Sequence, residues 1–225
     1  MLTLAPGPYT VTAGFSGDID YLSDTDAHAY TVTREESVVV YTGATTGDYS
    51  DPVTLRGVLT GDVAGGTPLA GRQLKFTLGS KSCTGTTNSS GVASCTLNVG
   101  DPAGPYSVTA SFAGDTYYQA SSGSKSFTVT TEETSLSYTG ATSGKRGTSA
   151  TLSARLSSDD GGISGRTINF TLGSLNCSGT TNASGVASCN VTLGSTTGTF
   201  TVNASFAGDS YFEAKSTSVS FRITS

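Results

Sequence analysis

Apolar and polar residues alternate strictly over several short stretches of the chain. From Tyr106 to Phe112 every second residue is apolar, and Ser or Thr fills the positions between. Residues 72–79 follow the same rule, with Leu74, Phe76 and Leu78 on one side. Alternation with period two puts one set of side chains on each face of a β-strand. The pattern therefore predicts strands that bury one face and expose the other.

The alternating pattern in the middle of the chain predicts about seven such strands, separated by turn segments rich in Gly, Asn, Asp and Ser. They lie near 37–41, 52–59, 72–79, 82–87, 92–99, 105–112 and 124–130. No window shows sustained apolar spacing of 3.6 residues, so long helices are not expected. Burial of one face per strand between two antiparallel sheets would form the core.

The pattern is repeated along the chain. Residues 104–115 recur at 198–209 with eight of the twelve residues identical, and an earlier copy occupies 7–18. The closing aspartates, Asp18, Asp115 and Asp209, are 97 and 94 residues apart. A unit of about 95 residues has the size of one immunoglobulin-like sandwich. The predicted fold class is all-β, as tandem immunoglobulin-like antiparallel β-sandwiches of about seven strands each.

The repeats divide the chain into three parts. Two complete modules are expected at 34–131 and 132–225, after a partial module at 1–33 that holds only the last two strands of its type. An isolated strand pair is marginal in water. Completion by a neighbouring copy would need a spare set of the first five strands, so a cut within a longer array is the simpler interpretation.

Composition and charge exclude some classes of partner. The net charge is −5 and the 12 basic residues are scattered, so no basic stripe is expected to bind nucleic acid. The longest apolar run, 38–41, is too short to insert into a membrane. The start of the chain lacks the basic and apolar parts of a signal peptide.

Four motifs resemble the bacterial Ig-like domain repeats, in particular the group with a Gly-Asp-x-Tyr ending. They are residues 76–78, 88–93, 104–110 and 114–118. The resemblance implies a β-sandwich strung with neighbouring modules of its kind into long secreted or cell-surface proteins, with no catalytic activity. The sequence departs from antibody-type domains, because Val108 occupies the place of the inter-sheet cysteine and no Trp is present.

The cysteines form two matched pairs. Cys83 and Cys95 are 12 residues apart, and so are Cys177 and Cys189. A symmetric hairpin between each pair would place the two sulfurs opposite each other, so two disulfides are expected. Zinc is the rival interpretation, but C-x-x-C pairs and His partners are missing. Two disulfides imply an oxidising compartment, and hence an extracellular or cell-surface location.

No constellation of residues predicts catalysis. The single histidine, His28, is expected in a solvated loop, without assigned Ser and Asp partners. The acidic pairs 35–36, 132–133 and 159–160 are expected in turns and linkers and not in a cleft. We therefore predict that the chain is not an enzyme, with no catalytic residues, no cofactor and no assigned metal ligand.

Calcium at the linkers is one open hypothesis. The linker entering a seven-strand sandwich should lie at the same end as the last hairpin loop. Glu35 and Glu36 would then lie near Asp115, and the pair 132–133 near Asp209. Carboxylate oxygens that converge in this way can bind Ca²⁺. Solvated linker charges explain the same residues.

Aromatic residues follow each Gly-Asp turn. They are Tyr21, Tyr117, Tyr118, Tyr211 and Phe212. Their rings could stack on sugars, although closing the core end and packing at module junctions explain them as well. The predicted function is a non-catalytic structural spacer or stalk of a secreted or surface protein, or part of an extracellular filament. The alternative is adhesion to a carbohydrate or a cell-surface protein through the end loops.

Overall fold

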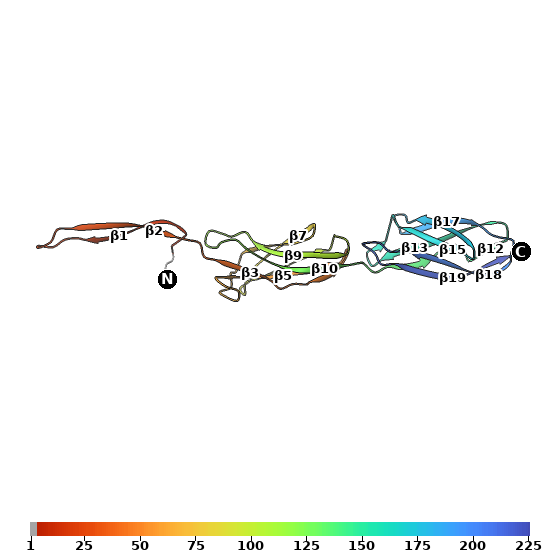
Figure 1. Ribbon diagram of the computed structural model, residues 1–225, viewed down its shortest axis with the longest axis horizontal. Helices are drawn as coiled ribbons and strands as arrows, with labels where there is room; N and C mark the ends of the chain where they lie inside the picture. Colours follow the sequence, from red (N-terminus) through yellow and green to blue (C-terminus); the bar gives the residue numbers. More distant parts are fainter. Residues whose placement is uncertain (1–3) are drawn as a thin grey trace. The chain divides into compact units, whose positions relative to one another are not determined.

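The computed structural model describes residues 4–225, and every regular element in them is a β-strand (Figure 1). None of these residues forms a helix with the length and apolar character needed to cross a membrane. The predicted all-β class is confirmed.

The first complete repeat folds as two sheets. One has the strand order β3-β5-β8 and the other β4-β10-β9-β6-β7. Their bounds are β3 Ser37–Tyr41, β4 Thr46–Asp48, β5 Pro52–Gly61, β6 Gln73–Leu78, β7 Lys81–Thr86, β8 Val92–Asn98, β9 Gly104–Phe112 and β10 Ser121–Thr130. The pairs β3–β5, β6–β7 and β6–β9 are antiparallel, whereas β4 runs parallel to the end of β10. The sequence pattern does not predict β4, because three residues are too few to show alternation.

The second repeat has the same arrangement. Its sheets are β11-β13-β14, with β17 paired to β13, and β12-β19-β18-β15-β16. The bounds are β11 Ser135–Tyr138, β12 Ser143–Lys145, β13 Ser149–Ser158, β14 Gly161–Gly162, β15 Thr167–Leu172, β16 Leu175–Thr180, β17 Val186–Thr192, β18 Gly198–Phe206 and β19 Lys215–Thr224. The short β12 again runs parallel to the last strand.

Each repeat has its own core between its two sheets. In the first, Leu74 and Phe76 of β6 and Ala110 of β9 lie within 3.4 Å of where a Cβ on Gly57 of β5 would be. The two sheets therefore pack face to face, and a side chain at position 57 would require its neighbours to shift by a few tenths of an ångström. Phe170 and Phe221 occupy the corresponding core of the second repeat, and neither is accessible to solvent. Alternation along each strand places these residues inward.

The chain divides into two compact units. One comprises the chain up to Thr45 together with 53–97 and 106–127, and the other comprises 46–52, 98–105 and 128–225. The loop that carries β4 and the turn before β9 thus belong to the same unit as the second repeat. This grouping places residues 46–52 with the linker that follows β10.

The N-terminal hairpin lacks a second sheet among the described residues. Strands β1 (Gly7–Phe15) and β2 (Asp24–Val32) pair only with each other (Figure 1). Val11 is 59% exposed, whereas its counterpart in the first complete repeat, Val108, is fully buried. The same residues that form a core elsewhere therefore lie on the surface here.

Candidate functional site

One disulfide in each sandwich ties its two sheets together. Cys83 is bonded to Cys95, and Cys177 to Cys189. The expected geometry within one hairpin is wrong. Cys83 lies on β7, which pairs with β6, whereas Cys95 lies on β8, which belongs to the other sheet. Each bond therefore joins the edges of the two sheets and not two paired strands.

Small residues let these edges approach. A Cβ on Gly85 of β7 would lie 2.4 Å from the carbonyl oxygen of Ser94, next to Cys95 on β8. Gly179 stands in the same relation to Ser188, at 2.5 Å. A side chain at either position would push the edges apart. The repeated Cys-x-Gly sequence thus combines a bond between the sheets with the space that the bond requires.

The Gly-Asp-x-Tyr motif forms a closed loop around its aspartate. One carboxylate oxygen of Asp115 accepts hydrogen bonds from the backbone N–H groups of Tyr117 and Tyr118, both at 2.8 Å. The other oxygen accepts from Nε of Arg72 at 3.1 Å. Partial burial alone would raise the pKa of Asp115, but the two backbone donors and the arginine together hold it below its ordinary value.

The second repeat reproduces this loop. Asp209 accepts from the backbone N–H groups of Tyr211 and Phe212 and from Nε of Arg166 at 3.0 Å. The guanidinium of Arg166 also lies over the Phe212 ring, 4.8 Å from its centroid. These arginines are not predicted from the alternation or from the motifs. The signal is present, because each stands 43 residues before its aspartate in both repeats.

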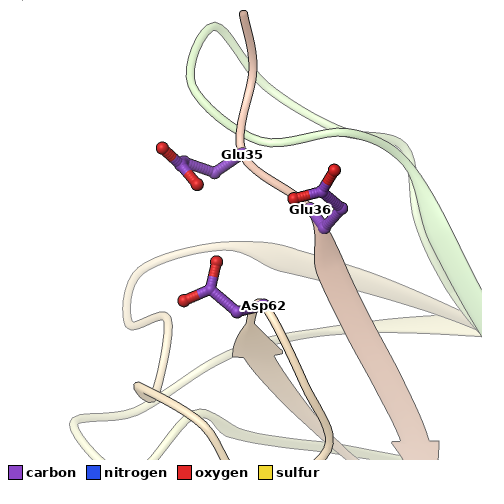
Figure 2. Close-up of side chains that lie close together, drawn as sticks. All are labelled: Glu35, Glu36 and Asp62. Carbon is purple, nitrogen blue, oxygen red and sulfur yellow. The ribbon is translucent and has the colours of Figure 1, made fainter.

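The predicted grouping of the linker acids with Asp115 and Asp209 is not found. These two carboxylates bond arginine and backbone donors, and the acidic clusters among the described residues contain linker acids without them. The linker backbone does pass this loop, since the N–H of Glu35 donates to the carbonyl of Tyr117. Its carboxylate lies instead with those of Glu36 and Asp62 (Figure 2), and all three residues are exposed.

A second acidic cluster lies in the second compact unit. One carboxylate oxygen from each of Asp51, Glu132 and Asp159 lies within 4.8 Å of the others. Glu132 is only 3% exposed, and its Oε2 atom is buried without a hydrogen-bond partner. Its backbone is fixed, because its N–H donates to the carbonyl of Tyr211 and its carbonyl accepts from Glu213. These backbone hydrogen bonds hold the carboxylate of Glu132 in a position shielded from solvent.

Electrostatics in this cluster favour protonation. Burial, together with the neighbouring Asp159 and Asp51, raises the pKa of Glu132 to about 7. Desolvation first, and then repulsion from Asp159, Asp48 and other acids, raises the pKa of Asp51. Three carboxylates that share one small space repel one another unless a proton or a cation intervenes.

The aromatic residues after the Gly-Asp turn differ in exposure between the copies, and Tyr21 in the N-terminal hairpin is 70% exposed. Tyr49 contacts Tyr211 and Phe212 edge to face, with ring centroids 4.7 and 5.5 Å away. In the first repeat Tyr118 is half-buried near Arg72, while Tyr117 is 50% exposed. In the second repeat, therefore, both rings contact Tyr49 and do not form an open platform.

His28 does not assemble a catalytic group. It lies on β2 and not in the expected loop, its side chain is 82% exposed, and its ring contacts Asp26 at 3.0 Å. Both side chains are solvated, so the pair lacks the buried, oriented acid of a catalytic triad.

No protein-family model and no curated protein matches the sequence. The fold does match a crystal structure of four tandem repeats from the extending region of a large adhesion protein. The TM-score is 0.54 at 22% identity, over 98% of this chain and 57% of that one, so this chain spans little more than half of that structure.

Two further matches have lower TM-scores. One is a structure concerned with host cell-surface retention of a 1.5-MDa bacterial ice-binding adhesin, with a TM-score of 0.35 and 13% identity over 96% of this chain and 74% of that one. The other contains the fibronectin(III)-like modules of CbhA from Clostridium thermocellum, with a TM-score of 0.32 and 15% identity over 82% of this chain and 92% of that one. At these identities the likeness concerns the fold alone. The chain has the all-β architecture of tandem immunoglobulin-like repeats and resembles repeats from the extending region of a large adhesion protein.

Proposed function

We propose that this chain is a non-catalytic extender of a secreted or cell-surface protein. Its working units are the modules 34–131 and 132–225. The observation that carries this proposal is the duplication of one closed sandwich, each copy with its own core and its own bond between the sheets. A repeat that contributes length needs stability and attachment to its neighbours, and it needs no cleft.

The likeness to an extending region supports the same role. It does so through the fold, since the identity of 22% is too low to carry function by itself. The two disulfides support an oxidising location outside the cytoplasm. Neighbouring modules of the same kind are the proposed partners of this segment.

A surface-display assay tests the extender role. A ligand-binding head is anchored to a bacterial surface through zero, one, two or four copies of residues 34–225, and cells are captured on ligand-coated beads. We expect capture to increase with copy number when the head is present and to be absent without it. Capture by headless copies would instead support adhesion through the end loops, where Tyr117 is exposed. Capture that is independent of copy number would contradict the extender role.

A further inference from the structure

The buried carboxylate of Glu132 has no basic partner, and the side chain beside it is the carboxyl group of Asp159. Ion pairs within residues 4–225 join His28 to Asp26, Arg72 to Asp115 and Arg166 to Asp209, and none involves this cluster. A buried charge is normally paired with an opposite charge or bound to a metal. The unbonded Oε2 atom of Glu132 is an acceptor that lacks its donor or cation.

The two other acids of the cluster add negative charge next to Glu132. Asp51 and Asp159 each bring an oxygen within 4.8 Å of Glu132 and of each other. More acids stand around them, because Asp48, Asp160 and Glu133 also repel the charge on Asp51. The local charge is strongly negative, and no basic side chain within the described residues pairs with the three central acids.

We propose that Asp51, Glu132 and Asp159 bind one Ca²⁺ ion. Calcium takes six to eight oxygen ligands in irregular arrangements, and carboxylates are its preferred protein ligands. Asp51 is half-buried and Asp159 is exposed, so water can complete the coordination sphere. The ion would tie the loop 46–52 to the linker residue Glu132 inside one compact unit.

The first repeat supplies an internal comparison. Glu35 and Asp62 are the repeat counterparts of Glu132 and Asp159, and they too converge (Figure 2). Glu35 is nevertheless exposed, and this cluster has no member that corresponds to Asp51. The buried, three-carboxylate arrangement therefore occurs once among the described residues.

Calorimetry and thermal unfolding of the full chain test the proposal. After removal of metal with EDTA, titration with CaCl₂ should give one binding event per chain. At a free Ca²⁺ concentration of about 100 times Kd, the melting temperature of the transition that involves residues 128–225 should rise by about 10 °C. Glu132→Gln should weaken binding by about 10-fold or more, because it removes a charged ligand but keeps the shape.

A matched variant distinguishes Ca²⁺ binding at this site from nonspecific binding of Ca²⁺ to acidic side chains. Glu35→Gln changes the repeat counterpart and should leave Ca²⁺ binding unchanged. Asp51→Asn, at a half-exposed position, should weaken binding as Glu132→Gln does, and it provides the test if Glu132→Gln fails to fold by circular dichroism. Absence of heat and of any thermal shift with Ca²⁺ would overturn the proposal. So would an equal loss of binding in Glu35→Gln.

The competing explanation has its own signature. If a shared proton and not a cation neutralises the cluster, the metal-free protein will not respond to Ca²⁺, and Glu132→Gln will melt at a higher temperature than the parent. That pair of results would replace the metal site by a carboxyl–carboxylate pair.

Discussion

Single side chains fix the end loop of each sandwich. In both repeats an aspartate joins two backbone N–H groups to the arginine that directly precedes β6 or β15. In the N-terminal hairpin Asp18 keeps the backbone bonds, to Asp20 and Tyr21. The Gly-Asp-x-Tyr motif is therefore explained by loop structure, with the arginine added where a full sandwich is present.

The pKa of Asp115 gives this motif a pH signature. Asp115→Asn should reduce the free energy of unfolding by about 1–2 kcal/mol near pH 7, because the charged bonds to Arg72 and to the backbone weaken. The pKa of Asp115 is lower in the folded protein than its ordinary value of 3.8. Its stabilisation is therefore complete above about pH 4 and is lost as the pH falls through the lower folded pKa.

Denaturant unfolding of both proteins in EDTA, at pH values from 7 to 2, measures this effect. The difference in free energy of unfolding between parent and variant should be constant down to about pH 5 and should decrease toward zero below it. The exposed Asp20→Asn serves as control and should differ little from the parent at any pH. A gap for Asp115→Asn that stays the same down to pH 2 would show that its charge does not matter.

At the scale of strands, the complete repeats differ from the N-terminal hairpin because a second sheet buries one face of their strands. Strands β9 and β10 have the same pattern as β1 and β2, yet only the former pair is covered. Phe127 is 1% exposed, whereas its counterpart Tyr30 is 48% exposed. The same alternation thus produces a core or a bare face according to what packs on it.

Hydrogen exchange should show this difference directly. Amides of β1 and β2 should exchange at least about 100-fold faster than those of β9 and β10, since local opening of an uncovered strand pair requires little free energy. Mass spectrometry of peptides from both hairpins in one sample provides the measurement. Equal protection would show that something covers the N-terminal hairpin in solution.

Most of the strands could be predicted from the sequence. The alternation located β3, β5, β6, β7, β8, β9 and β10 within about three residues, because each buries one face. The cysteine spacing indicated the bonded pairs but not which sheets they join, since a 12-residue separation fits a hairpin and a crossover equally well. The acidic cluster was missed because Asp51 and Glu132 meet through packing, which no local pattern records.

At the scale of the whole chain, the protein contains two separately closed sandwiches, each with a disulfide between its two sheets. A chain of this kind resists extension in steps, because each sandwich unfolds cooperatively around its own core. Residues between the bonded cysteines stay locked until the disulfide is reduced. The length released at each step therefore reports both the number of sandwiches and the bond within each.

Single-molecule pulling of the full chain tests this claim most directly. Under oxidising conditions we predict two unfolding events of similar length, apart from the low-force extension of the hairpin. After reduction each event should lengthen by about 4 nm, because the 12 residues of separation between the paired cysteines become extensible at about 3.5 Å each. A single unfolding event, or step lengths that reduction does not change, would contradict the account.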